Sequence, residues 1–530
     1  MIQPLLQSCK VRCQTTRSKL ILLGLFVIFL RTVSNILYFK TYGLRASFGA
    51  DIWYFAGVAR GYHHLFFADP LQWLLPCLGN LPPERLYDVL LLFSNALHLL
   101  SVFLLFGCVR DLYNDEWAAF WSSAIYSSFV TSFHFCTASF HHQQFGLPIL
   151  IGLLWLGYRL LNGKKIFSYF WALFIFLAMI GLGIGPDVLV ILILSIPCGI
   201  LRYLQKIKSP SKRWIAQTLV LGLVIYGFIS LSPLIKELLT SLAAHFRGID
   251  LAAQYQLQAA DLMPFGWSMD STGFTPLRIF WIGLIANYHL AALVFFGMII
   301  WAWMKSRFFE VMFAAVAIGF STQAGRFFYV VEIGFAILLG WVLAHGLRSS
   351  IFWKNIIGSI CLFLFLGLAA WRGIACFYPG NMVIILSHLQ KNPKPHSFVL
   401  CTPTYGFLIQ GLTEVKPTSD LHHVDPTWVR LALRPTEEAL EALKKHGVTH
   451  LFFTSYDFRL GWTSTPDGNK VFGIASSGGF EYFLPSIMED IQKTLVYQAL
   501  TENSFLPGAK LLAASTDKAT QIRSVLFELK

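Results

Sequence analysis

The sequence predicts a polytopic α-helical membrane region over residues 1–371, followed by a soluble α/β domain over residues 372–530. Hydrophobic residues make up 55% of the 530-residue chain and charged residues only 13%, whereas about a quarter of an ordinary soluble protein is charged. The apolar residues gather in runs of roughly 17–25, the length that a helix needs to cross a bilayer. From Arg372 onward, charged and turn-forming residues return to the density of a soluble domain.

We count about eleven apolar runs that could cross a membrane as helices. The basic segment 1–19 precedes the first run, which is too long for the core of a cleaved signal peptide and has no small-residue cleavage site, so we expect a retained anchor. The expected spans are 20–38, 89–109, 117–135, a fourth ending at 159, 166–182, a sixth ending at 202, 215–234, an eighth ending before 305, a ninth ending near 322, a tenth from 327 to before 348, and 355–371.

The basic residues between these runs predict the topology. Lys and Arg clusters fall on alternate loops, after the second, fourth, sixth, eighth and tenth runs, which is typical of cytoplasmic loops. The N-terminus is therefore expected in the cytoplasm and the C-terminal domain outside. The net charge of +13 is explained by these loops, so we do not expect a nucleic-acid partner.

The C-terminal part alternates strand and helix patterns, which predicts a small α/β domain. The segment 435–446 begins with acidic residues and ends with basic ones, as the helix dipole favours, and Gly447 follows as a C-terminal cap. The expected strands are 397–401, 448–454, 510–514 and 524–529, and the expected helices are 435–446 and 487–500.

Polar residues on the predicted outer side are the candidates for chemistry. Asp51 follows the first span within Gly49–Tyr54, and could serve a reaction or simply cap a helix that begins at Ile52. His141, His142 and Gln143 follow the third span, where they could serve a site or only form interfacial hydrogen bonds. One of the histidines, together with Asp51 and with Asp261 of the long loop 236–275, would make a mixed nitrogen and oxygen metal site.

Arg326 lies at the mouth of the tenth span, directly before the aromatic residues that lead to Tyr329. A cation at the edge of an apolar span is costly unless it has a partner or reaches the interface. Arginine is also the side chain best shaped to hold a phosphate. A phosphate site and an interfacial arginine both remain open, with Glu332 a possible partner.

The order of these residues resembles that of the C-type (GT-C) membrane glycosyltransferases, and is most similar to the catalytic subunit of oligosaccharyltransferases. In that family an Asp stands in the first outer loop (here Asp51), and an aromatic-Asp-x-Glu motif follows the third span (here Phe140–Gln143). An acid lies in a large outer loop with Pro three residues later (here Asp261–Pro264), and an Arg-Phe-x-Tyr segment enters a late span (here Arg326–Tyr329).

The resemblance implies a site and a reaction. It implies that Asp51, His141 and Asp261 are catalytic, that they are also the candidate ligands of a divalent metal such as Mg or Mn, and that Arg326 contacts the phosphate of a polyprenyl-linked sugar donor. His142, Gln143 and Tyr329 are further candidates. The acceptor would be a protein, a lipid or a glycan, and membrane lipids would surround the spans.

The chain also departs from the family pattern. His141 and Gln143 replace the two acids of the second motif, although hard divalent ions prefer carboxylates. No counterpart of the family's Trp-Trp-Asp acceptor motif is present, and the nearest segment is Thr404–Phe407. We therefore keep three alternatives open: a metal-independent monosaccharide transferase of the same superfamily, a transporter of a lipid-linked intermediate, and an inactive binding relative. The expected location is the bacterial inner membrane, with the C-terminal domain in the periplasm, or in the lumen of a eukaryotic cell.

Overall fold

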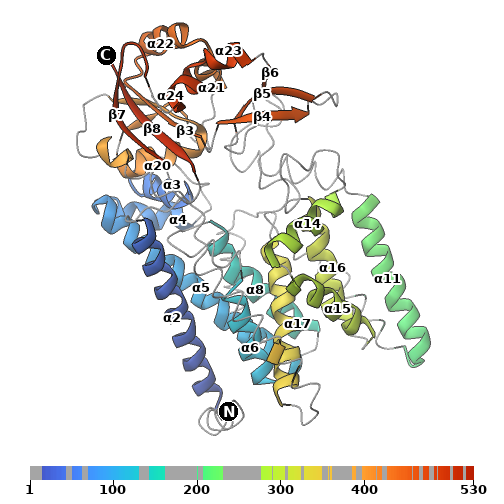
Figure 1. Cartoon of the computed structure of the whole chain (residues 1–530). Coiled ribbons are helices and arrows are strands. Elements are labelled where there is room, and N and C mark those ends of the chain that lie inside the picture. Colours follow the sequence, from blue (N-terminus) through green and yellow to red (C-terminus); the bar gives the residue numbers. More distant parts are fainter. Residues whose placement is uncertain are drawn as a thin grey trace.

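A computed structural model gives the fold of the chain (Figure 1). The structure describes residues 15–42, 50–62, 70–129, 142–161, 200, 204, 207–230, 276–288, 290–304, 308–323, 328–348, 356, 359–360, 385–389, 397–413, 415–419, 426–455, 458–464, 470–476, 483–485, 488–501, 505–516 and 521–530. The predicted fifth, sixth and eleventh spans and the boundary at 371/372 lie wholly or mostly outside these residues, and stay predictions.

The helical region contains the described elements from α2 to α17. Helix α3 lies at the end nearest the C-terminal region, the domain end, whereas α2 and α6 begin at the opposite end, the far end (Figure 1). The elements are α2 (Thr16–Tyr42), α3 (Ala50–Ala59), α4 (Pro70–Leu74), the 3-10 helix η1 (Leu75–Leu78), α5 (Pro83–Tyr113), α6 (Glu116–Tyr126), α8 (His142–Leu161), α11 (Pro210–Ser230), α14 (Pro276–Tyr288), α15 (Leu290–Met304), α16 (Phe308–Gln323) and α17 (Phe328–Arg348).

Three of the described helices are long and apolar enough to cross a membrane, over Thr16–Ile36, Arg85–Tyr113 and Val330–Leu347. They correspond to the predicted first, second and tenth spans. Helices α11 and α16 form where the seventh and ninth spans are expected. The apolar runs therefore located these helices correctly, because burying a long apolar segment requires that its backbone hydrogen bonds be made internally.

The third and eighth spans differ from the prediction. Helix α6 ends at Tyr126, within the predicted third span, and the hydroxyls of Ser127 and Ser128 donate to the carbonyl of Ala124 at 2.7 and 3.2 Å. Such bonds offer the backbone an alternative to helix continuation. Residues 130–135 of that span lie outside the described residues. The eighth span consists of two helices, α14 and α15, whose rings Trp281 and Phe296 approach to 3.9 Å.

The C-terminal region contains a five-stranded sheet in the order β2-β1-β3-β8-β7 and a three-stranded sheet in the order β4-β5-β6. Strand β1 runs parallel to β2 and β3, and β8 runs antiparallel to β3 and β7. The elements are β1 (Phe398–Leu400), α20 (Pro403–Thr413), β2 (Lys416–Pro417), α21 (Pro426–Ala432), α22 (Thr436–Lys445), β3 (His450–Thr454), β4 (Phe458–Ser464), β5 (Lys470–Ser476), β6 (Phe483–Pro485), α23 (Met488–Gln492), α24 (Leu495–Leu500), β7 (Ala509–Thr516) and β8 (Arg523–Leu529).

The predicted strands of this region are confirmed as β1, β3, β7 and β8, and the predicted helix 435–446 as α22. Gly447 has a φ of 76°, as a glycine cap requires. The single helix expected over 487–500 is wrong: the structure has α23 and α24. Thr494 interrupts the helix because it pairs with Pro435 as an isolated bridge and caps α24, its side chain accepting from Tyr497 N.

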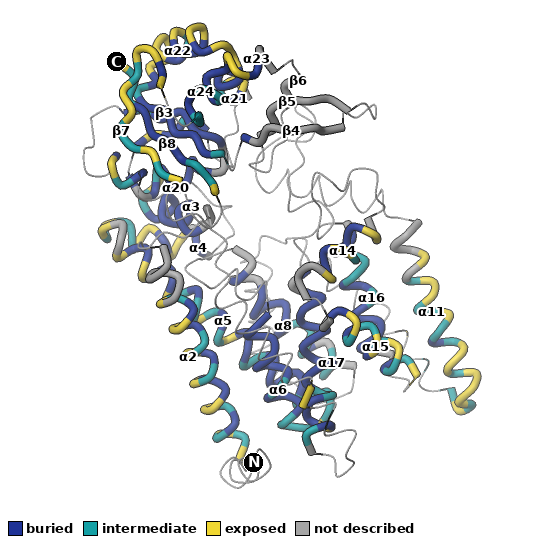
Figure 2. The backbone as a smooth tube through the Cα atoms, in the orientation of Figure 1, coloured by how far each residue is buried: buried dark blue, intermediate teal, exposed yellow. Residues whose placement is uncertain are grey.

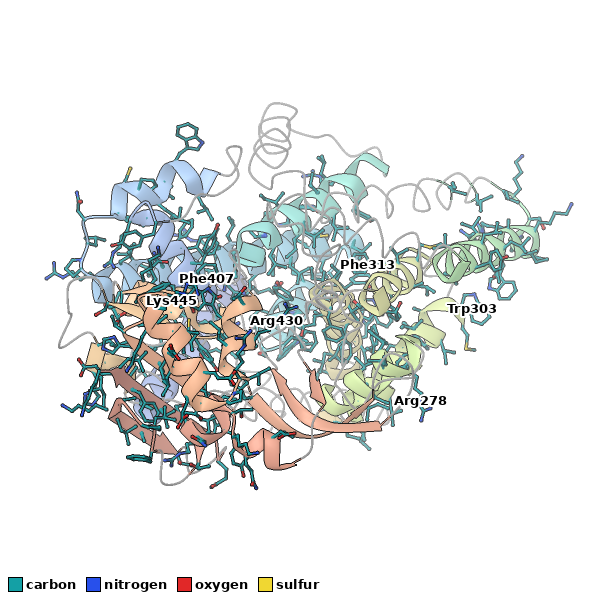
Figure 3. All side chains as sticks on the ribbon, turned by 90° about the horizontal axis from the view of Figure 1, so that it is seen from above. Arg278, Trp303, Phe313, Phe407, Arg430 and Lys445 are labelled. Carbon is teal, nitrogen blue, oxygen red and sulfur yellow. The ribbon has the colours of Figure 1, made fainter. Side chains whose placement is uncertain are left out.

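The described residues form three hydrophobic cores. One fills the helical region, where α6 and α17 are buried and α2 and α11 are exposed along much of their length (Figure 2). Trp303 of α15 stacks on Trp214 of α11 at 5.5 Å, beside the edge of the region (Figure 3). A second core lies within the C-terminal region. The third, the junction core, combines residues of α3, η1 and the start of α5 with residues of β1, α20, β3 and β8.

Candidate active site

Asp51 is the second residue of α3, a helix that the junction core encloses. All residues from Ile52 to Ala59 are buried, and a helix that is apolar on every face belongs in a core. The helix begins at Ala50, so the alternative in which Asp51 caps a helix starting at Ile52 is wrong. An acid in the first turn of a helix is favoured by the positive end of its dipole.

Two contacts fix α3 between the helical and C-terminal regions. The ring of Trp53 lies 5.5 Å from that of Tyr87 at the start of α5. The ring of Tyr54 lies 4.8 Å from that of Phe407 in α20, and Figure 3 shows Phe407 where the C-terminal region overlies the first helices. Asp51 therefore lies in the first turn of a helix that is packed on both sides.

Helix α20 approaches α3 so closely that only glycine fits at one position. A Cβ atom on Gly411 would lie 2.7 Å from Trp53 Cε3 and 3.0 Å from Trp53 Cβ. The helix includes the Thr404–Phe407 segment, and sequence reasoning did not predict it. Pro403 is its first residue, and proline at the first helical position is a recognised start signal that could have revealed it.

His142 and Gln143, which follow the predicted third span, are the first residues of α8. The next residue, Gln144, is buried, and its Oε1 accepts a hydrogen bond from Ser94 Oγ at 2.9 Å. Ser94 lies two turns along α5 from Tyr87, a distance of about 10 Å. Helix α5 therefore brings α3 and the first turn of α8 to the same end of the helical region.

The start of α17, which carries Tyr329, lies at this end as well. Ser122 Oγ of α6 donates to the carbonyl of Ile337 at 3.3 Å, and Phe129 stacks on Phe335 at 5.3 Å. As the residue number rises from 122 to 129, the number of the contacted residue in α17 falls from 337 to 335, so α6 and α17 are antiparallel. Because α6 starts at the far end, α17 starts at the domain end, beyond the last turn of α6.

Charged residues are paired at the far end. Lys19 is bonded to Glu116, which also accepts from the hydroxyl of Thr16. Asp111 accepts from Trp155 Nε1 at 2.8 Å and lies 3.5 Å from Arg159 Nε. These cations belong to the loops that the positive-inside pattern assigned to one side.

The pKa of Glu116 reflects this environment. Partial burial raises it, but hydrogen bonds from Lys19 and Thr16 and the positive charge of Lys19 outweigh the burial, so that the pKa lies below its ordinary value of 4.5.

His141, Asp261 and Arg326 lie outside the described residues. Among the residues that the structure does describe, no group of three His, Cys, Asp or Glu side chains could hold a metal ion. The predicted metal ligands and the phosphate contact therefore stay predictions. Sequence reasoning missed Ser94 and Gln144, although polar residues inside an apolar span are by themselves a signal of a functional or structural contact.

Protein-family models and curated proteins give no match to the chain. Solved structures do. The apo oligosaccharyltransferase of Archaeoglobus fulgidus matches with a TM-score of 0.56 and 14% identity over 95% of this chain and 80% of that one. AglB of the same organism, in complex with an inhibitory peptide and a dolichol-phosphate, matches with a TM-score of 0.56 and 13% identity over 95% and 80%.

A complex of the Archaeoglobus fulgidus enzyme with Zn and sulfate matches with a TM-score of 0.52 and 14% identity, over 94% of this chain and 79% of that one. At such low identity the likeness establishes the fold and not the chemistry. The chain therefore has an oligosaccharyltransferase-like fold, as the order of its motifs indicates.

Proposed function

We propose that this chain is a membrane glycosyltransferase that transfers a sugar or oligosaccharide from a polyprenyl phosphate or pyrophosphate donor to an acceptor on the outer face of the membrane. The observation that carries the proposal is the convergence of three motif-bearing elements at the domain end. These are the first turn of α3 with Asp51, the first turn of α8 with His142, and the start of α17 with Tyr329. They come from distant parts of the chain, and the chain has a fold similar to that of an archaeal oligosaccharyltransferase.

The reaction needs a cationic group that stabilises the leaving phosphate and a base that takes the proton of the nucleophile. The acceptor nucleophile attacks the anomeric carbon of the donor sugar, and the bond between that carbon and the phosphate oxygen breaks. Arg326 would stabilise the negative charge that develops on the leaving phosphate. Asp51 would orient the nucleophile and take its proton. His141 or His142 would supply part of the role of the missing acids, and Asp261 would complete the site from the long loop.

A neighbouring structure supports the proposed donor and acceptor classes. The neighbouring AglB structure holds a dolichol-phosphate and an inhibitory peptide, which supports a lipid-linked donor and a peptide acceptor for this chain. A lipid or glycan acceptor stays open, because Thr404–Phe407 lacks the acceptor motif of protein N-glycosylation. We place the N-terminus in the cytoplasm and the C-terminal region outside, in the bacterial inner membrane.

The residues proposed for a metal site are Asp51, His141 and Asp261. Two carboxylates with an imidazole would suit a divalent metal such as Mn or Zn, and a carboxylate-rich site would suit Mg. A neighbouring structure was solved with Zn and sulfate. Since two of the family's acids are replaced here, the metal-independent mechanism is the main alternative, and it shares the same fold.

Transfer from a radiolabelled polyprenyl-linked donor tests the proposal. Membranes containing the wild type are compared with Asp51→Ala, Asp51→Asn and Arg326→Ala, with and without a chelator. We expect each substitution to reduce transfer by at least about a hundredfold, the effect of removing a key electrostatic group. Arg348→Ala, at the other end of α17, is the matched control and should retain activity. Loss of transfer with the chelator supports a metal, and persistence supports the metal-independent mechanism.

Intact folding without transfer from any polyprenyl-linked donor would contradict the proposal. It would favour the transporter or the inactive relative.

A further inference from the structure

Two buried polar side chains lie one turn apart on α5, within the span Arg85–Tyr113. Ser94 has 0% and His98 has 1% of its surface exposed. Residues four apart on a helix lie on the same face. Polar groups inside a membrane span are costly unless they are bonded to a partner. The partners of Ser94 and His98 therefore indicate which helices the two side chains hold in place.

Ser94 holds the start of α8. Its hydroxyl donates to Gln144 Oε1 at 2.9 Å, and both residues are buried. Gln144 directly follows His142 and Gln143 in the first turn of the helix. The hydrogen bond therefore fixes the rotation and depth of the turn that carries these two candidate residues.

His98 holds the end of α6 through an arginine. Arg31 Nη2 of α2 lies 3.0 Å from His98 Nε2 and donates to the carbonyl of Ser127 at 2.7 Å. Because arginine has only donors, His98 Nε2 accepts. The His98 ring also stacks on Tyr126, the last residue of α6, with centroids 5.8 Å apart. A positive guanidinium suits the negative end of the α6 dipole.

We propose that Ser94 and His98 are positioning residues that fix the first turn of α8 relative to the end of α6, and so place His142 and Gln143 at the active site. The inference rests on the proposed function. Neither residue is assigned contact with substrate: Ser94 acts through Gln144, and His98 acts through Arg31 and Tyr126. One face of α5 thereby fixes the position of α8 relative to α6.

The test compares two buried serines of the same helix. Ser94→Ala removes the bond to Gln144, whereas Ser101→Ala removes a bond from Ser101 Oγ to Leu97 O within α5 itself, at 2.9 Å. Both serines have 0% exposure, so the loss of a buried hydroxyl is matched. His98→Phe keeps a ring on Tyr126 but removes the acceptor for Arg31, and His98→Gln restores an acceptor.

Hydrogen–deuterium exchange of the full-length protein in detergent reads the geometry without requiring activity. We expect Ser94→Ala to speed exchange in the first two turns of α8 by about tenfold, which corresponds to ~1.4 kcal/mol. Ser101→Ala should leave those turns unchanged, and Ser94→Thr should restore protection. His98→Phe should speed exchange at the last turn of α6, and His98→Gln should do so much less.

Transfer kinetics complete the test. Ser94→Ala should lower kcat on the order of tenfold with little change in KM, because small displacements of catalytic groups cost rate. Equal exchange in Ser94→Ala and Ser101→Ala would overturn the proposal. Faster exchange without altered kcat would also overturn it, since the bond would then be structural only. If the wild type transfers no sugar, the proposed function fails, while the exchange data still report whether the two serines differ.

Discussion

Several of the described helix pairs pack through a glycine, and in two of them the glycine meets a different kind of neighbour. In the membrane pair, α6 and α17, a Cβ atom on Gly340 would lie 2.3 Å from the backbone nitrogen of Ser122. In the junction pair, α3 and α20, a Cβ atom on Gly411 would meet the ring of Trp53. One contact is backbone against backbone, and the other is backbone against an aromatic side chain.

The surroundings of these two pairs differ. Inside a membrane, lipid is as apolar as a leucine side chain, so helices gain little by burying apolar groups and associate through close backbone approach and hydrogen bonds. The bond from Ser122 Oγ to the carbonyl of Ile337 at 3.3 Å fits this. At the junction, burial of the large rings of Trp53, Tyr54 and Phe407 supplies the stabilisation. The first pair is expected to be rigid and the second adjustable.

The largest effect is expected for Gly340→Ala. The added methyl would overlap the backbone of α6, which cannot move as a side chain can, so we expect a loss of about 3 kcal/mol or more. Thermal unfolding in detergent measures it. Gly297→Ala in α15 is the matched control because nothing lies within 4 Å of its added Cβ, and replacing a helical glycine by alanine should stabilise by up to about 1 kcal/mol. Equal melting temperatures for the two variants would contradict the backbone contact.

The sequence could predict the spans of α2, α5 and α17, because uninterrupted apolar runs are a local signal. It could not predict where α6 ends, since the turn at Ser127 also depends on Arg31 from another helix. Nor could it predict the break at Thr494, which depends on a bridge to Pro435. Elements set by composition were predictable, whereas those set by tertiary partners were not.

The second effect in size concerns the junction pair. Gly411→Ala should cost about 1–3 kcal/mol as the ring of Trp53 is displaced, and should reduce sugar transfer because Trp53 lies two residues from Asp51 in α3. Combining it with Trp53→Phe, which makes room for the methyl, should recover part of both losses. A double-mutant cycle of melting temperature and transfer rate measures this coupling. Strictly additive effects would show that the two residues do not press on each other.

For the candidate site, the sequence placed Asp51, His142 and Tyr329 on one side of the membrane, and the structure brings their helices to one end of the helical region. The packing of α3 against α20 had no local signal, because Tyr54 and Phe407 lie in distant parts of the chain. The order of the motifs could be predicted from the sequence, but the contact between α3 and α20 could not.

The smallest effect on stability is expected for the charged contact between Lys19 and Glu116 at the far end. Because the folded-state pKa of Glu116 is lowered, its contribution to stability is fully present above pH 4.5, the ordinary value, and is lost as the pH falls through the lower folded-state pKa. The Glu116 side chain is 30% exposed, so the contribution should be below about 1 kcal/mol. Melting temperatures of the wild type and Glu116→Gln should differ at pH 7 and converge in acid.

The penalty of Gly411→Ala should stay constant over the same pH range, because its contact is with the uncharged ring of Trp53. A Glu116→Gln difference that does not change with pH would show that Lys19 stabilises the far end through packing on Trp117, whose ring centroid lies 5.3 Å from Lys19 Nζ, and not through its ion pair.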